Sequence, residues 1–253
     1  MDWFRRLYLG TWQFGGQFKR MSFTEIKSLL DFALDSGISR FDTAVVYGGG
    51  RVEEVLGRCL PKDVAIITKV PAITRPQIGS LEPIHSFYSP DHIYRSVHGS
   101  LRRLRRSTLD TVLLHNWLPT WSPDATSVFR CLARLKELGL AKRVGISLPD
   151  GFPDLLDQKT LSFVDVVEAP FNPGEQWVLR QLPALLDLNK EVVLRSLFAQ
   201  GKLLRAYSRH QLLKDALELQ TSVAIGMTTE EQITLNISQL REGGSSDTTV
   251  QID

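Results

Sequence analysis

Four ionisable side chains stand at or just beyond the ends of three short segments of the chain. Each segment reads as the end of a buried β-strand, because it is an apolar run closed by a titratable residue. In a parallel β/α barrel the C-terminal ends of the strands converge on one face, and that face holds the reactive groups. The side chains that we expect to meet there are Asp42, Tyr47, Lys69 and His115.

This set of side chains is suited to protonating an alkoxide while a hydride reaches a carbonyl carbon. A tyrosine alone is a poor acid at neutral pH, because its unperturbed pKa is about 10. A lysine ammonium beside it favours the phenolate, and a carboxylate can keep that lysine charged and oriented. A histidine near the phenol can bind a substrate carbonyl or share the proton. Any one of these residues alone is more often a cap, a solvated cation or a core histidine, so the prediction depends on their combination.

The rest of the chain supplies the elements of such a barrel. Strand and helix patterns alternate about eight times, and the strands are too apolar to have a wet face. The predicted strands cover residues 7–12, 39–44, 64–70, 109–115, 143–148, 164–169, 192–197 and 222–226. The predicted helices cover residues 22–36, 50–60, 89–106, 122–139, 152–159, 175–189, 207–219 and 229–240. This pattern predicts an α/β protein with a single-domain (β/α)8 TIM barrel over residues 1–240, followed by a flexible polar tail over residues 241–253.

Composition argues against several other classes of protein. The chain has 253 residues, of which 43% are hydrophobic and 23% charged, and its formal net charge is +2. No segment is apolar enough to span a bilayer, and two cysteines make no disulfide framework, so we expect a cytoplasmic protein without a membrane partner. The histidines share no metal-ligand spacing, so no metal site is predicted. The arginine-rich run 102–106 has no interleaved aromatic residues and ends a helix, so no nucleic-acid partner is predicted.

The motifs around the four ionisable residues resemble those of the aldo-keto reductase superfamily along nearly the whole chain. Leu9-Gly10-Thr11-Trp12, followed by Gly15-Gly16, is similar to the opening strand and loop of that family. Phe41-Asp42-Thr43-Ala44 with Tyr47-Gly48 resembles its most diagnostic motif. The resemblance implies an NAD(P)H-dependent oxidoreductase that reduces an aldehyde or ketone to an alcohol. It also implies that Tyr47 is the general acid, that Lys69 and His115 tune it, and that Asp42 supports Lys69.

The same resemblance implies a nicotinamide dinucleotide across the barrel mouth, NADP(H) rather than NAD(H). Ser147 and Glu168 fall in motifs that contact the nicotinamide amide, with Glu168 in place of the usual glutamine. Arg195 falls where the family stacks a side chain on the nicotinamide ring, and a planar guanidinium can serve there. Met227 and Gln232 replace the basic residues that many members use to bind the 2′-phosphate. The implied cofactor contacts are Ser147, Glu168, Arg195, Ser196, Leu197, Gln200, Gly201, Gly226, Thr228, Thr229, Gln232 and Asn236.

Several alternatives stay open at this stage. Trp12 and Trp117 are expected to line the substrate pocket rather than the core, and Thr228 with Thr229 could simply cap the last helix. Leu148, where asparagine is common in the family, and Glu168 make the nicotinamide site atypical. The same barrel could therefore act as a lyase, epimerase or dehydratase, or as a cofactor-sensing binding protein. The small-molecule carbonyl substrate cannot be identified, because the loops 71–88, 116–123 and 199–206 that would select it are irregular. The oligomeric state is equally hidden.

Overall fold

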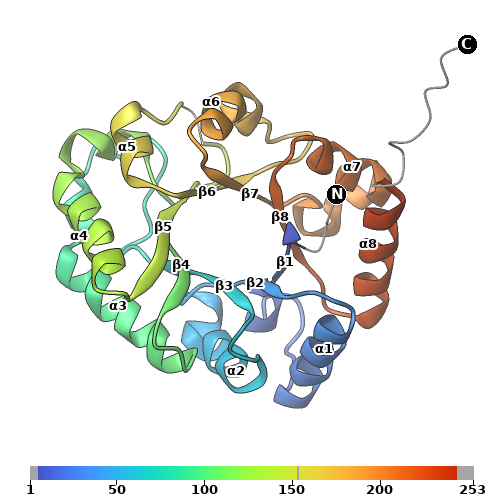
Figure 1. Ribbon diagram of the computed structural model, residues 1–253. Coiled ribbons are helices and arrows are strands. Elements are labelled where there is room, and N and C mark those ends of the chain that lie inside the picture. The colour runs from blue at the N-terminus through green and yellow to red at the C-terminus, as the bar shows by residue number, and fades with distance from the viewer. Residues whose placement is uncertain (1–4, 153, 244–253) are drawn as a thin grey trace, which may run out of the picture.

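In a computed structural model, which describes residues 5–152 and 154–243, eight parallel strands form a closed barrel surrounded by helices (Figure 1). The strands are β1 Leu7–Gly10, β2 Arg40–Asp42, β3 Ala65–Val70, β4 Leu109–His115, β5 Ala141–Ser147, β6 Val166–Pro170, β7 Glu191–Arg195 and β8 Ser222–Gly226. The helices are α1 Phe23–Asp35, α2 Arg51–Cys59, α3 Pro90–Arg103, α4 Thr126–Glu137, α5 Gln158–Phe163, α6 Leu182–Asp187, α7 Arg209–Glu218 and α8 Glu230–Gly243. Each strand pairs with the next, and β8 pairs with β1. The predicted (β/α)8 TIM barrel is confirmed.

Two separate apolar clusters follow from the alternation of side chains along the strands. The larger cluster packs the outer faces of the strands against the apolar faces of the helices. The smaller cluster lies inside the barrel and consists of Tyr8, Ile67, Leu113, Val166, Val193 and Ala224. Because packed side chains fill the barrel interior, a ligand can be bound only at one of its ends. Among the helices that the structure describes, none has the length and apolar character needed to cross a membrane.

An ion network around Glu191 closes the N-terminal end of the barrel. Its carboxylate lies 3.0 Å from the Arg40 guanidinium, pairs with Arg143 on the other oxygen, and accepts a hydrogen bond of 3.1 Å from the Tyr8 hydroxyl. Burial opposes ionisation of Glu191, but the two arginines outweigh it and lower the pKa of this carboxyl. Ion pairs and a hydrogen bond therefore close the N-terminal end of the barrel, and a ligand can bind only at the C-terminal end.

Three predicted helices differ most in their starts from those observed, each for a local reason. The predicted helix 152–159 is wrong, because α5 begins only after Asp157, whose carboxylate caps it by accepting the Thr160 N–H at 2.7 Å. The predicted helix 175–189 shortens to α6 after a 3-10 turn, since Pro183 fits only the first turn of a helix. The predicted helix 122–139 starts at Thr126, after a 3-10 turn that contains Pro123.

The predicted boundary at residue 240 falls inside the last helix. Helix α8 continues to Gly243, so residues 241–243 of the predicted tail belong to it. Residues 244–253 lie outside the described residues, and their flexibility stays a prediction.

Candidate active site

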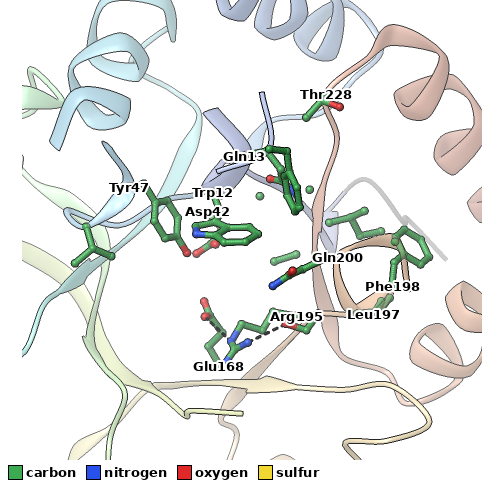
Figure 2. A pocket seen from close by; sticks show the side chains of 18 of the residues that line it. Trp12, Gln13, Asp42, Tyr47, Glu168, Arg195, Leu197, Phe198, Gln200 and Thr228 are labelled. Carbon is green, nitrogen blue, oxygen red and sulfur yellow. Dashed lines mark hydrogen bonds and ion pairs between the residues drawn. The ribbon is translucent and has the colours of Figure 1, made fainter. Parts of the chain in front are cut away.

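A cavity of about 1780 Å³ opens at the C-terminal end of the barrel. Asp42, Tyr47 and His115 line it, and Lys69 is fully buried behind them with its ammonium hydrogen-bonded to Asp42. Figure 2 shows the Tyr47 ring reaching from one wall of the cavity toward Asp42. The structure thus brings together the four side chains that the sequence singled out.

The backbone after β2 fixes two of these side chains. Thr11, just after β1, donates both its N–H and its hydroxyl to the carbonyl oxygen of Asp42, each at 2.9 Å. Tyr47 then opens a 3-10 turn in which Gly48 and Gly49 have φ of +61° and +64°. Glycine adopts this left-handed backbone at less steric cost than other residues, so the two glycines favour the sharp turn between Tyr47 and the start of α2 at Arg51. A short, tightly held turn therefore positions Tyr47 next to Asp42.

Lys69 is the electrostatic centre of the site. Besides Asp42, its ammonium lies 3.2 Å from a carboxylate oxygen of Glu168 and 3.2 Å from the carbonyl oxygen of Thr43. The same nitrogen is 5.6 Å from the centre of the Tyr47 ring. Burial disfavours the ammonium, but the charges of Asp42 and Glu168 outweigh it and raise the pKa of Lys69 above its ordinary value. Lys69 therefore stays charged beside the phenol.

The tyrosine and the histidine are both held in their neutral forms. Burial raises the pKa of Tyr47 to about 12, and the Lys69 charge opposes this rise without cancelling it. Burial, together with the Lys69 charge, lowers the pKa of His115 to about 3. The backbone of His115 is anchored by the Tyr88 hydroxyl, which donates to its carbonyl oxygen. At neutral pH the site thus offers a phenol that can donate a proton and a neutral imidazole that can hydrogen-bond a carbonyl.

Glu168 is the unexpected member of this network. Its side chain is fully buried on β6, accepts a hydrogen bond of 2.9 Å from Ser147, and lies 3.6 Å from the Arg195 guanidinium (Figure 2). Burial opposes its ionisation, but Lys69 and Arg195 outweigh burial and lower the pKa of this carboxyl. Burial and the Glu168 charge in turn raise the pKa of Asp42, since two carboxylates share one lysine. The candidate catalytic groups therefore lie among two buried carboxylates, Asp42 and Glu168, and two cations, Lys69 and Arg195.

Most of the predicted cofactor contacts do line the cavity. They are Glu168, Arg195, Ser196, Leu197, Gln200, Gly201, Gly226, Thr228, Thr229 and Gln232. Ser147 and Asn236 do not: both are fully buried behind the lining, where Ser147 bonds Glu168 and Asn236 accepts from Arg209. Met227 is also fully buried, in the apolar core.

The two tryptophans that were predicted to line the substrate pocket lie in different places, one in the cavity wall and one in the core. Trp12 lines the cavity, with its ring edge-on to Phe18 at 5.2 Å between centroids. The prediction for Trp117 is wrong. The chain turns at Asn116, whose φ is +64°, and the Trp117 ring is fully buried, where it stacks on Phe129 at 5.2 Å. Its place is in the aromatic core under the helices, outside the cavity lining.

The far end of the cavity lies at the start of α8. Thr229 caps this helix by accepting the Gln232 N–H at 3.2 Å, and the Gln232 side chain accepts the Thr228 N–H at 2.8 Å. Arg209, which sequence reasoning missed, also lines this end, and its guanidinium lies 5.0 Å from the centre of the Phe198 ring. Arg209 stands at the beginning of α7, apart from every recognised motif, so only the fold could place it here.

The lining fits a nicotinamide dinucleotide. The cavity runs without interruption from Tyr47 to Thr228, and its volume exceeds the roughly 300–1,000 Å³ of ordinary small-molecule pockets. Gln13 lines the cavity, and its buried side-chain oxygen has no hydrogen-bond partner among the described residues. Gly226 leaves room for the Gln13 side chain, which a Cβ at that position would overlap. The cavity thus offers space for a dinucleotide and an unsatisfied polar group at Gln13.

The protein is therefore a (β/α)8 barrel with a tyrosine, a lysine, an aspartate and a histidine gathered at the C-terminal end of its strands. The model of the Aldo/keto reductase family matches residues 6–238, and the chain belongs to that family.

Two relatives of known name extend this comparison. The uncharacterized oxidoreductase YcsN of Bacillus subtilis (strain 168) is 28% identical over 149 residues, which cover 54% of this chain and 49% of YcsN. A protein named as a probable voltage-gated potassium channel subunit beta of Oryza sativa subsp. japonica is 25% identical over 235 residues, covering 88% of this chain and 58% of that protein. The chain thus spans about half to three fifths of the length of these two relatives.

Solved structures share the fold. The holo form of an aldo-keto reductase from Bacillus halodurans superposes with a TM-score of 0.74 at 21% identity, over 98% of this chain and 88% of that one. An aldo/keto reductase from Klebsiella pneumoniae, in complex with NADP and acetate, gives a TM-score of 0.68 at 20% identity, over 97% of this chain and 87% of that one. The likeness at these identities establishes the barrel.

Proposed function

We propose that the protein is an NAD(P)H-dependent carbonyl reductase in which Tyr47 donates the proton. The observation that carries the proposal is the meeting of Tyr47, Lys69 and His115 at one wall of a cavity large enough for a dinucleotide and a substrate. A bound nicotinamide dinucleotide would supply the hydride. The Klebsiella pneumoniae relative in fold is described with NADP, which supports this kind of cofactor.

The residues divide the proton chemistry between them. The neutral His115 imidazole orients the substrate carbonyl by a hydrogen bond, and the Tyr47 hydroxyl passes its proton to the oxygen as negative charge develops there. An alkoxide is a far stronger base than a phenolate, so this transfer is favourable even with the pKa of Tyr47 at about 12. The Lys69 ammonium, held by Asp42, stabilises the phenolate that remains.

A basic residue, Arg209, lines the end of the cavity that lies at the start of α8. Met227 and Gln232 offer no charge to a 2′-phosphate, but Arg209 lines the cavity beside Thr228 and Gln232. Its guanidinium is held by Asn236 at 2.9 Å and keeps further donors for a phosphate. We therefore propose that the protein prefers NADP(H), with Arg209 as the source of the preference.

Titration of the purified protein with NADPH and NADH, followed by protein fluorescence, tests this proposal. Trp12 in the cavity wall should report binding, and Trp12→Phe serves as the control for that signal. We expect NADPH to bind more tightly than NADH and Arg209→Gln to abolish the difference. Binding of neither dinucleotide would contradict the proposal, and an unchanged preference in Arg209→Gln would remove Arg209 from it.

One observation favours a second candidate function. Glu168 places a buried carboxylate 3.2 Å from Lys69, so the site holds a potential base beside its acid. That pair would suit a lyase, epimerase or dehydratase that moves protons without net redox change. Product analysis distinguishes the two functions, because only the reductase consumes one NAD(P)H for each alcohol formed.

A further inference from the structure

One cation that lines the cavity, Arg75, has no partner among the residues that the structure describes. The cationic side chains that line the cavity are Lys19, Arg75, Arg195 and Arg209. Lys19 lies 3.4 Å from Glu25, and Arg195 pairs with Asp150 at 2.7 Å. Arg209 lines the end of the cavity at the start of α8, where we propose that the cofactor phosphate binds. Arg75 makes no hydrogen bond or ion pair with any residue in the described ranges, so its donors are free for a ligand.

Arg75 lies close to the reacting groups. It stands on the loop that follows β3, the strand that carries Lys69, and the N–H of Ile73 ties this loop to the Phe87 carbonyl at 2.9 Å. Its charge is near enough to His115 to help lower the pKa of that imidazole, although burial and Lys69 contribute more. A guanidinium at this position can reach a substrate whose carbonyl is bound by His115 and Tyr47.

Part of the wall of the same cavity is apolar and exposed to solvent. Phe18, Val46 and Ile78 all line it and are 56%, 48% and 46% exposed. Large apolar side chains left open to solvent around a cavity commonly mark the surface that a ligand covers. Apolar walls with a single free guanidinium suit a molecule that has an apolar body and an anionic end.

We propose that Arg75 binds an oxyanion on the carbonyl substrate, which makes the substrate class an aldehyde or ketone with an apolar body and a carboxylate or similar group. This inference rests on the proposed function and specifies it. A guanidinium matches a carboxylate with two parallel N–H···O bonds, a geometry that neither Lys19 nor Lys69 can provide. The phosphates of a dinucleotide would lie toward Thr228 and Arg209, away from this loop.

Matched substrates test the assignment. Unbranched ω-oxocarboxylates of four to seven carbons, each beside its neutral primary amide, are reduced with NADPH by the wild-type protein. We expect a kcat/KM about fivefold higher for the acid than for the amide at one or more chain lengths, which is the upper end of what a solvent-exposed ion pair contributes, about 1 kcal/mol. Arg75→Gln should remove this preference through KM while the amides react as before, and Arg75→Lys should keep part of it. Lys19→Gln is the control and should keep all of it.

A binding measurement separates the anion site from the chemistry. Hexanoate and hexanamide are titrated against the protein by calorimetry, and we expect hexanoate alone to bind measurably and to lose at least fivefold in affinity in Arg75→Gln. If the protein reduces no carbonyl compound but hexanoate binding depends on Arg75, the proposed function fails and the anion site stands. Equal kcat/KM values of the wild type for acids and amides would overturn the Arg75 assignment. Unchanged affinity for hexanoate in Arg75→Gln would overturn it as well.

Discussion

Replacing Glu168 with glutamine should make Tyr47 more acidic. The carboxylate of Glu168 is buried among Lys69, Arg195 and Ser147, and its negative charge helps to raise the pKa of Tyr47. Glutamine has nearly the same shape and can keep contacts to Ser147 and Lys69 through its amide nitrogen and oxygen, respectively. Lys69 remains charged in the variant because Asp42 still binds it. The substitution therefore removes one charge with little change of packing.

The size of the effect follows from two distances. The Lys69 nitrogen lies 3.2 Å from Glu168 and 5.6 Å from the centre of the Tyr47 ring, so the carboxylate is no more than about 9 Å from that ring. Two unit charges at this distance interact by about 2 kcal/mol at an effective dielectric constant of about 20. One unit of pKa corresponds to about 1.4 kcal/mol, so Glu168→Gln should lower the pKa of Tyr47 by roughly one unit or more.

Under the proposed mechanism, alcohol oxidation reports this pKa directly, because in that direction the Tyr47 phenolate accepts the proton. The hydride-transfer rate, measured by stopped flow at saturating NADP⁺, should rise with pH, and Glu168→Gln should move the rise toward lower pH by about one unit. Ser147→Ala removes a hydrogen bond to Glu168 without removing its charge and should leave the rise in place. If the hydride-transfer rate of Glu168→Gln rises at the same pH as that of the wild type, or at a higher pH, with the fold and cofactor affinity intact, the electrostatic reasoning is refuted.

Three further predictions concern pH dependence and stability. Because the pKa of His115 is lowered to about 3, kcat/KM for reduction should show no inflection near pH 6.5; one that disappears in His115→Gln would contradict a neutral imidazole. Glu191→Gln should lower the free energy of unfolding in urea by about 2 kcal/mol at pH 7, since it leaves two arginines without their partly buried partner. The pKa of Glu191 is depressed in the folded state, so this loss should shrink as pH falls below about 4 and vanish below the folded pKa; a loss independent of pH would count against it. Gly145→Ala should cost about 3 kcal/mol in the same measurement, because its Cβ would overlap the Val166 carbonyl on the next strand, whereas Gly79→Ala, where nothing stands within 4 Å, should cost less despite its φ of +85°.

The barrel, and the meeting of four candidate residues at its mouth, were predictable because each leaves a local signal. A buried strand is recognised in the sequence as an apolar run. A charged residue at its C-terminal end, such as Lys69, must lie at the end of the barrel where the C-terminal ends of all strands meet. The order of Asp42, Tyr47, Lys69 and His115 along the chain follows the order of β2, β3 and β4, so neighbouring strands bring them together.

The features that sequence reasoning missed depend on contacts between distant segments. Nothing around Trp117 distinguishes a pocket wall from a core position, because the turn at Asn116 decides where the ring goes. Arg75 and Arg209 stand in a loop and at a helix start, and only closure of the barrel brings them to the cavity. The start of α5 was misplaced because Asp157 caps the helix later than the apolar pattern suggested.

The most direct test of the account compares Tyr47→Phe with the wild type in a single experiment. Both proteins are titrated with NADPH by fluorescence and then mixed with an aldehyde substrate at saturating NADPH, and hydride transfer is followed by the loss of NADPH absorbance. We expect the variant to bind NADPH as tightly as the wild type, since the aromatic ring keeps its place, and its transfer rate to fall by roughly 10²–10⁴-fold, the usual contribution of a general acid. A Tyr47→Phe protein that binds NADPH and reduces the aldehyde at the wild-type rate would contradict the role of Tyr47 as proton donor.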